Sequence, residues 1–151
     1  MKNPDAIYFQ SKGFPEFRFM SNFFLSRFTD GQFTYPSVEH YYQSQKTFDK
    51  TEALAIMNAP HPAVARKLGQ QVLLDKNWDE RKLFVMRVGC RLKFEQREDL
   101  SAMLAATYPL ELIEFAPWGD TFWGVDKNYE GQNNLGIILM EIRMDLIKGT
   151  K

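Results

Sequence analysis

The sequence is poor in the residues that build disulfides and metal sites. Among 151 residues it has one cysteine, Cys90, and two histidines, His40 and His61. A single cysteine cannot close an internal disulfide, and these three residues do not follow the spacing of a zinc or iron ligand set. We therefore expect a protein of a reducing compartment that uses no metal and no other cofactor.

An excess of charge of one sign and long apolar runs are also missing. Lys and Arg number 19, as do Asp and Glu, so no global field draws the chain to DNA or to anionic lipid. Residues 66–97 carry nine basic and four acidic side chains, a net of +5, and residues 98–151 carry four and nine, a net of −5. The basic segment is either a local basic face or a solvated helix surface. We expect a soluble, cytoplasmic protein with no membrane partner, because neither a signal peptide nor a spanning segment is present.

Aromatic residues are abundant, with 13 Phe, 6 Tyr and 3 Trp in a chain that is 44% hydrophobic. This composition and length are typical of one domain with a full core. No repeat and no low-complexity linker interrupts the chain. The sequence therefore predicts a single domain over residues 1–151, in which rings not needed for the core can line a pocket for a flat ligand.

Short strands and several helices are predicted from residue patterns. Strands are expected at residues 6–9, 17–19 and 109–115, and a hairpin at residues 27–35 with its turn at Asp30-Gly31. Helices are expected from Ser37 onward, then over residues 51–58, 62–68, 79–96, 99–106 and 134–147. The apolar seam of the longest helix comprises Leu83, Met86, Cys90 and Phe94, so Cys90 is expected to be buried. Together these elements predict an α+β fold, a compact helix-rich domain with a small antiparallel sheet.

The helix that begins after Ser37 carries a notable polar pattern. Glu39, Gln43 and Lys46 follow one another at i, i+4 and i+7, which places a carboxylate, an amide and an amine on one face. Glu39 lies in the first turn, where the helix dipole favours an ionised carboxylate. The pattern allows a reactive stripe, but surface helices often show the same spacing, so spacing alone favours the solvated charges of an amphipathic helix.

A series of short motifs runs in order along nearly the whole chain. They are Phe19-Met20-Ser21-Asn22-Phe23, Pro36-Ser37-Val38-Glu39-His40-Tyr41-Tyr42-Gln43 with Gln45-Lys46, Gly69, Trp78, Lys82, Val85-Met86, Lys93-Phe94, Pro117, Asp120, Trp123-Gly124, Gly131, Asn133, Leu135-Gly136, Leu139-Met140 and Arg143. This series resembles the NADAR family of YbiA-like proteins. The resemblance implies a helix-rich α+β fold and a hydrolase, an N-glycosidase that cleaves the bond between a ribose anomeric carbon and an exocyclic amino nitrogen. The implied substrates are phosphorylated ribosylamine intermediates of the riboflavin pathway, or ADP-ribosyl groups on guanine, including ADP-ribosylated DNA.

The resemblance also implies catalytic roles, and two routes stay open. In the first, Glu39 is the base that activates water, and Asp120 is the acid or a ribose ligand, since the spacing Pro117-x-x-Asp120-x-x-Trp123-Gly124 is kept. In the second, the sugar ring opens and the amine of Lys46 captures the anomeric carbon as a Schiff base.

Further residues are expected to bind the substrate. Trp78 and Trp123 would stack on a base or close the pocket, Asn22, Gln43 and Asn133 would bind ribose hydroxyls or phosphate oxygens, and Ser21, Gly124 and Asp126 complete the set. Without the resemblance, both tryptophans would be read as core residues. His40 and His61 are expected to be structural.

Two features leave the function open. Residues 125–130 replace a second small, glycine-rich step that many relatives have, so the substrate is less secure than the bond that is cleaved. A module that binds ADP-ribose or another nucleotide without turnover is the alternative from a different class, and a structural partner protein is a third.

Overall fold

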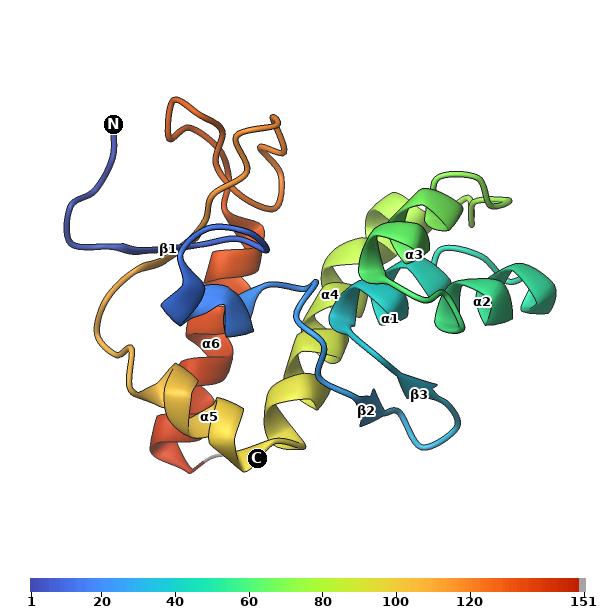
Figure 1. The fold of residues 1–151 in the computed structure, drawn as a ribbon, viewed down its shortest axis with the longest axis horizontal. Coiled ribbons are helices and arrows are strands. Elements are labelled where there is room, and N and C mark those ends of the chain that lie inside the picture. Colours follow the sequence, from blue (N-terminus) through green and yellow to red (C-terminus); the bar gives the residue numbers. More distant parts are fainter. Residues whose placement is uncertain (150–151) are drawn as a thin grey trace. The chain divides into compact units, whose positions relative to one another are not determined.

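The structure, a computed structural model, describes residues 1–149, and the chain divides into two units. Unit 1 is formed by Met1–Ser21 and Arg97–Lys151, and unit 2 by Asn22–Gln96. Among the described residues helices dominate, and each unit holds one two-stranded sheet (Figure 1). The predicted helix-rich α+β class is therefore confirmed. A single domain over residues 1–151 stays a prediction.

Helix α1 (Val38–Ser44) is the centre of unit 2. It packs against α2 (Lys50–Met57), α3 (Pro62–Gly69) and α4 (Trp78–Glu95), and all seven of its residues are buried (Figure 1). Complete burial of a helix means that it has no solvent face. The interpretation of its polar residues as solvated charges is therefore wrong.

The starts of the helices in unit 2 follow the capping rules, with two shifts from the prediction. Ser37 caps α1 as predicted, because its hydroxyl accepts a hydrogen bond from His40 N at 3.2 Å. Helix α2 is capped by Asp49 and not at residue 51, and α4 begins after Asn77 and not after residue 79. Helix α3 begins with Pro62 at its first position, as expected.

Helix α4 is 18 residues long and buries most of its predicted seam. Met86, Cys90 and Phe94 are at most 2% exposed, so the burial of Cys90 is confirmed. Leu83 is 38% exposed, contrary to the prediction, and Trp78 is the buried side chain at this end of the helix. Within residues 1–149, neither α4 nor any other helix has the length and hydropathy to cross a membrane.

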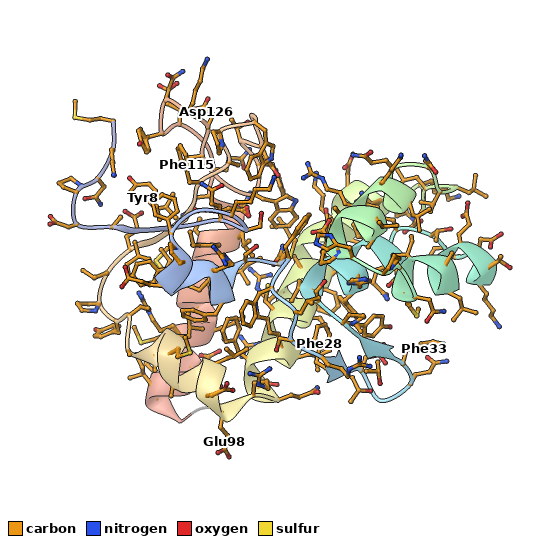
Figure 2. All side chains as sticks on the ribbon, in the orientation of Figure 1. Tyr8, Phe28, Phe33, Glu98, Phe115 and Asp126 are labelled. Carbon is orange, nitrogen blue, oxygen red and sulfur yellow. The ribbon has the colours of Figure 1, made fainter. Side chains whose placement is uncertain are left out.

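The predicted hairpin is present in unit 2. Strands β2 (Phe28–Thr29) and β3 (Thr34–Tyr35) pair antiparallel, and Gly31 adopts a φ of +95° in the turn between them. Phe28 is buried, whereas Phe33 in the turn is 36% exposed (Figure 2). The pair is the small antiparallel sheet that the sequence predicts, although its strands are only two residues long.

A second sheet, not expected from the sequence, lies in unit 1. Strands β1 (Ile7–Phe9) and β4 (Leu112–Glu114) pair in parallel, with Ile7 opposite Leu112. Helix α6 (Asn134–Lys148) packs against β4 and against α5 (Glu98–Ala105). Buried aliphatic residues of α6 fill the interface, namely Leu135, Ile138, Leu139 and Ile142. Tyr8 on β1 meets the ring of Phe115 edge-on at 6.5 Å (Figure 2).

The strand predicted at residues 17–19 is wrong. These residues belong to η1 (Pro15–Met20), a 3₁₀ helix whose first residue is proline. Proline fixes φ near the helical value and lacks the N–H that a strand ladder needs. The 3₁₀ helix buries the consecutive residues Phe19 and Met20, which a strand would place on opposite faces.

Replacing the cap of α1 tests how far unit 2 depends on this helix. Ser37→Ala removes the acceptor of His40 N and the partner of the His40 ring, so we expect the free energy of unfolding to fall by about 1–3 kcal/mol. Ser11→Ala, which removes a hydroxyl from a loop of unit 1, should change it by less than about 0.5 kcal/mol. Urea denaturation compares the two variants, and equal losses would contradict the capping role.

Candidate functional site

The carboxylate of Glu39 is buried in α1 and is held by an amide. Its side chain is 7% exposed, and Gln43 Nε2 donates a hydrogen bond to Glu39 Oε2 at 2.7 Å. The backbone N–H of Glu39 donates to Asn22 O at 3.1 Å. Burying a carboxylate costs free energy unless hydrogen bonds or opposite charges compensate. A carboxylate that the fold keeps buried in this way is a candidate for chemistry.

Lys46 provides an amine near this carboxylate. It lies two residues past the end of α1, so it follows the helix and does not continue its face. Its Nζ is 5.6 Å from the centre of the Tyr42 ring. Burial lowers the pKa of the Lys46 amine, and the negative charge of Glu39 partly opposes this shift. Arg66 and Lys82 lower the pKa further. A lowered pKa makes more of the neutral, nucleophilic amine available.

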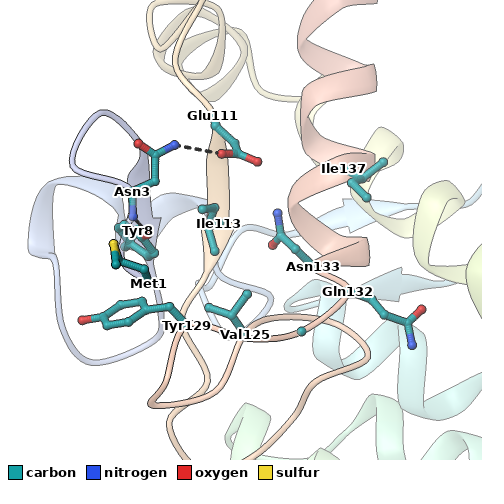
Figure 3. Close-up of a pocket in the computed structure, with 11 residues that line it drawn as sticks. Met1, Asn3, Tyr8, Glu111, Ile113, Val125, Tyr129, Gln132, Asn133 and Ile137 are labelled. Carbon is teal, nitrogen blue, oxygen red and sulfur yellow. Dashed lines mark hydrogen bonds between the residues drawn. The ribbon is translucent and has the colours of Figure 1, made fainter.

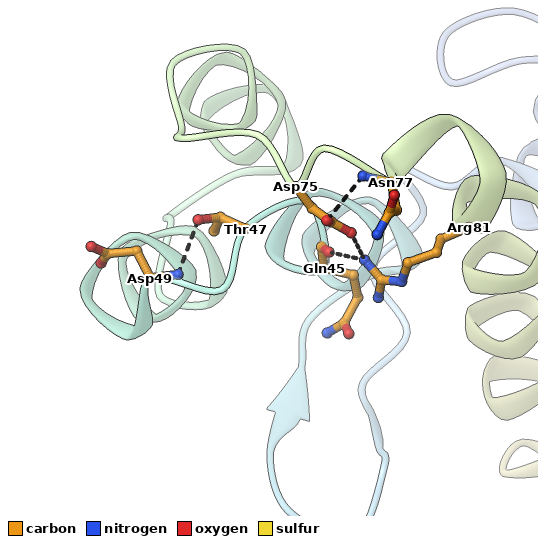
Figure 4. A network of polar contacts seen from close by, with 6 residues as sticks. All are labelled: Gln45, Thr47, Asp49, Asp75, Asn77 and Arg81. Atoms are coloured by element: carbon orange, nitrogen blue, oxygen red, sulfur yellow. Dashed lines mark hydrogen bonds and ion pairs between the residues drawn. The ribbon is translucent and has the colours of Figure 1, made fainter.

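The backbone around Lys46 is clamped by Asp75, which precedes α4, and by Arg81 in the first turn of α4. Figure 4 draws Asp75, Arg81 and the neighbouring Gln45. Asp75 N donates to Lys46 O at 2.7 Å, and Arg81 Nη1 donates to Gln45 O at 3.3 Å. The two clamping residues also pair with each other, since Arg81 Nη1 lies 2.7 Å from Asp75 Oδ2. The backbone N–H of Asn77 and then Arg81 lower the pKa of Asp75. Two linked contacts therefore fix the backbone that carries the amine.

Sequence analysis did not identify Asp75 and Arg81 as parts of the site. The available signal was an aspartate two residues ahead of Asn77, an arrangement in which a side chain bonds the backbone N–H two positions on. The pairing of Asp75 with Lys46 O joins segments that are distant in sequence, and no local pattern predicts it.

Trp78 has a packing role in the structure. It is 5% exposed and meets Tyr42 edge-on, with ring centres 5.1 Å apart. The guanidinium of Arg81 lies 5.7 Å from its ring centre. This corresponds to the core interpretation of Trp78, and stacking of Trp78 on a base stays a prediction.

Asn22 and Ser21 lie at the junction of the two units in the sequence. Asn22 Nδ2 donates to Met86 Sδ at 3.4 Å and Asn22 Oδ1 accepts from Cys90 Sγ at 3.9 Å, so the amide faces α4. Its contribution to the site is its backbone oxygen, which accepts from the N–H of Glu39. Ser21 is 7% exposed. Direct contact of either residue with a substrate stays a prediction.

The predicted residues of unit 1 order the aromatic loop over residues 118–126. Asp120 Oδ1 accepts from Phe122 N at 3.2 Å and from Trp123 N at 3.0 Å. Gly124 is required by space, because a Cβ there would lie 2.5 Å from Glu114 O. Asp126 Oδ1 accepts from the backbone N–H groups two and four residues further on, at 2.8 and 3.1 Å (Figure 2).

Asn133 joins α6 to β4. Its Oδ1 accepts from Glu114 N at 3.0 Å and its Nδ2 donates to Leu112 O at 2.9 Å. Both polar atoms of the amide are therefore used by the fold. Asn133 thus has a structural role, and its contact with ribose stays a prediction.

A cavity of about 290 Å³ lies in unit 1 (Figure 3). It is lined by Met1, Asn3, Tyr8, Glu111, Ile113, Val125, Tyr129, Gly131, Gln132, Asn133 and Ile137. At its edge Asn3 Nδ2 donates to Glu111 Oε1 at 3.1 Å. Asp120, the predicted catalytic residue of unit 1, is not part of the lining. Of the residues that the sequence selects for catalysis or substrate binding, Asn133 is the one that lines this cavity.

The structural interpretation of both histidines is confirmed. Because a carbonyl can only accept, His40 Nε2 donates to Ala59 O at 3.0 Å, and its Nδ1 accepts from the Ser37 hydroxyl at 2.8 Å. Burial lowers the pKa of His40, an effect that the carbonyl of Ala59 partly opposes. His61 caps α3, since its Nδ1 accepts from Ala63 N at 3.0 Å.

Comparison with known proteins assigns this arrangement to a family. The NADAR domain family model matches residues 8–147. N-glycosidase YbiA of Shigella boydii is 42% identical over 119 residues, which cover 78% of this chain and 73% of that protein. Riboflavin biosynthesis protein VVA0006 of Vibrio vulnificus is 36% identical over 130 residues, 85% of this chain and 35% of that protein.

A solved structure extends the similarity to the fold. The NMR structure of the Escherichia coli protein YbiA superposes with a TM-score of 0.86 at 35% identity, covering 99% of this chain and 89% of that chain. Similarity at this level includes the course of the backbone as well as the sequence motifs.

The clamp on Lys46 is tested by hydrogen exchange. Arg81→Ala removes the partner of Asp75 and of Gln45 O, so the contact from Asp75 N to Lys46 O should open more often. We expect exchange of the Asp75 amide to speed up by about tenfold or more. The control is Arg91→Ala, whose pair with a glutamate one turn away spans 3.9 Å. This surface pair should leave the Asp75 amide within about twofold of its original rate, and an equal effect would contradict the clamp.

Proposed function

The chain belongs to the NADAR domain family and is an N-glycosidase, a hydrolase of N-glycosyl compounds, and we propose that it cleaves the bond between a ribose anomeric carbon and an exocyclic amino nitrogen. One observation carries the proposal. A buried carboxylate, Glu39, and a half-buried amine of lowered pKa, Lys46, act on each other electrostatically in unit 2. Together they supply a proton donor or acceptor and a nucleophile.

The proposed substrate is a phosphorylated ribosylamine of the riboflavin pathway. Two relatives support this choice by their names, riboflavin biosynthesis protein VVA0006 and the maize riboflavin biosynthesis protein PYRR, which is 32% identical over 127 residues, 76% of this chain and 20% of that protein. The positive charges of Arg66 and Lys82 near Lys46 favour a ligand that carries phosphate. ADP-ribosylated guanine contains the same kind of bond and is the second proposed substrate.

A direct assay distinguishes these substrates. The protein is incubated with ribosylamine phosphates and, separately, with guanine-ADP-ribosylated oligonucleotides, and mass spectrometry follows release of the amine and the ribose. Release from the first alone supports the small metabolite, and release from the second supports a nucleic-acid substrate. A protein that binds either compound without releasing products would be the non-catalytic module, and the proposal would be wrong.

The environment of Lys46 favours the Schiff-base route over direct attack by water. The ring opens to an imine between the anomeric carbon and the substrate nitrogen, and the neutral amine of Lys46 adds to that carbon. The ionised Glu39 carboxylate takes a proton from the lysine nitrogen that has added and passes it to the substrate nitrogen, which then leaves with the electron pair of its bond to carbon. Water adds to the remaining imine, the bond to Lys46 breaks, and ribose closes again. One water molecule is consumed, and both side chains return to their starting states.

Glu39 transfers the protons in this series of reaction steps. Its buried position, with one oxygen bonded to Gln43, keeps the carboxylate in a fixed orientation. It delivers a proton to the leaving nitrogen and recovers one from the attacking water. Without the lysine step, the same carboxylate would activate water directly, which is the alternative route.

Roles are also proposed for residues of unit 1. Asp120 is proposed as the second acid or as a ribose ligand, and Trp123 as the ring that meets the base. Gly124 and Asp126 of the loop over residues 118–126, and Ser21 at the end of η1, are proposed to contact the substrate. We also propose a cytoplasmic location, which is compatible with the burial of the one cysteine in the core.

Chemical trapping tests the role of Lys46. Borohydride added during turnover should reduce the Schiff base to a stable adduct on the peptide that contains Lys46, and Lys46→Met should lose both adduct and turnover. Because the pKa of Lys46 is lowered, adduct formation should rise with pH and level off below about pH 10.4, where an ordinary lysine titrates. Lys76→Met serves as the matched control. Full turnover by Lys46→Met would contradict this route.

Replacement of Glu39 separates catalysis from binding. Glu39→Gln keeps the shape of the side chain but removes the proton acceptor, so we expect kcat to fall by roughly 100- to 10,000-fold. The dissociation constant for substrate, measured by calorimetry, should stay within about threefold. Glu80→Gln, at an exposed position of α4, should behave like the original protein. An active Glu39→Gln variant would remove this carboxylate from the mechanism.

A further inference from the structure

The amide of Gln43 is buried with only one of its two polar groups bonded. Its side chain is 4% exposed, and Nε2 donates to Glu39 Oε2 at 2.7 Å. Oε1 has no hydrogen-bond partner among the residues that the structure describes. A carboxylate can only accept, so the bond to Glu39 dictates which way the amide points. The unbonded oxygen is the consequence of holding the carboxylate.

Gly69, the last residue of α3, provides the space into which this amide fits. A Cβ on Gly69 would overlap Gln43 Oε1 and would lie 2.7 Å from its Cδ and 3.0 Å from its Cβ. Gly69 is not among the residues with positive φ, so its backbone conformation does not require glycine. Helices α1 and α3 pack against each other. The missing side chain is therefore explained by space for the amide.

We propose that Gly69 and Gln43 are positioning residues for Glu39. The glycine leaves room for the Gln43 amide, and the amide fixes one oxygen of the Glu39 carboxylate, which sets the direction in which the carboxylate meets the reacting atoms. The proposal rests on the proposed role of Glu39. It adds a specific dependence of catalysis on α3, which itself holds no proposed catalytic residue.

The Gln43 amide links Gly69 to Glu39 through two contacts, one of packing and one of hydrogen bonding. A methyl group at position 69 forces the amide away from its place, because Gln43 is buried and its neighbours are packed. Displacement removes the hydrogen bond to Glu39 Oε2. A carboxylate that turns even slightly loses alignment for proton transfer, and rates fall steeply with such misplacement. Substrate binding does not use this bond, so KM should change little.

A double-mutant cycle tests the proposal. Gly69→Ala should lower kcat by about tenfold or more with KM within about twofold. Gln43→Ala should lower kcat by a similar factor. Because Gly69 acts through Gln43, adding Gly69→Ala to Gln43→Ala should cost less than a further factor of about two. Losses of kcat that simply multiply, or a folded Gly69→Ala variant with unchanged kcat, would overturn the proposal.

Gly89→Ala is the matched control. Gly89 lies within α4, and a Cβ there would approach the Tyr41 ring on α1 to 2.8 Å, so this change crowds α1 without touching the Gln43 amide. It should keep kcat within about twofold when assayed well below its unfolding temperature. If it lowers kcat as much as Gly69→Ala does, general crowding of α1 explains the loss and the proposal is wrong.

An NMR measurement works without any substrate. The side-chain NH₂ signals of Gln43 should shift with pH as Glu39 titrates in the original protein, and this coupling should be lost in Gly69→Ala but kept in Gly89→Ala. If the Gln43 signals in the original protein do not respond to the protonation of Glu39, the positioning role is wrong even when the enzyme is active. If the signals follow Glu39 but no ribosylamine or ADP-ribosyl substrate is cleaved, the proposed function fails and the contact stands.

Discussion

Burying a carboxylate among packed helices costs free energy, and the packing of unit 2 provides a hydrogen bond that compensates for this cost. Glu39 sits in a helix whose residues are all buried, and one amide, that of Gln43, donates to it directly. The amide in turn depends on the absence of a side chain at Gly69. Helices α1 and α3 thus both contribute to the position of one carboxylate oxygen. The backbone of the same residue is held separately, because Asn22 O accepts from the N–H of Glu39. The residues that pack the core of unit 2 therefore also place the reactive carboxylate.

The amine is supported in a different manner. Lys46 lies beyond the end of α1. Its backbone is held by a hydrogen bond from Asp75 N to Lys46 O, and the adjacent Gln45 O accepts from Arg81. These contacts hold the backbone, whereas the amine itself lies 5.6 Å from the centre of the Tyr42 ring. This arrangement is suited to a group that must form and break a covalent bond, whereas the proton-handling carboxylate is held through its side chain. The two kinds of support correspond to the two chemical tasks that we propose.

Features that depend on neighbouring residues could be predicted from the sequence, whereas pairing between distant segments could not. The serine cap of α1, the Asp30-Gly31 turn and the helix over residues 134–147 depend on neighbours in the sequence, and all three are confirmed. The parallel pairing of β1 with β4 joins distant segments and was missed. For the site, spacing selected Glu39 and Gln43 correctly as neighbours, but it extended the helix to Lys46, which the turn after α1 actually positions. The packing roles of Trp78 and Asn133 depend on tertiary contacts that spacing does not encode.

The parallel pairing of β1 with β4 has a consequence for how the chain reaches this structure. Unit 2 is one continuous stretch, whereas unit 1 is built from segments on both sides of it. During synthesis every contact within Asn22–Gln96 becomes available before β4 leaves the ribosome, and β1 has to wait without its partner until then. Short-range contacts form quickly and long-range strand pairs form slowly. The nascent chain therefore acquires its helical centre first, and its earliest strand is among the last parts to find its place.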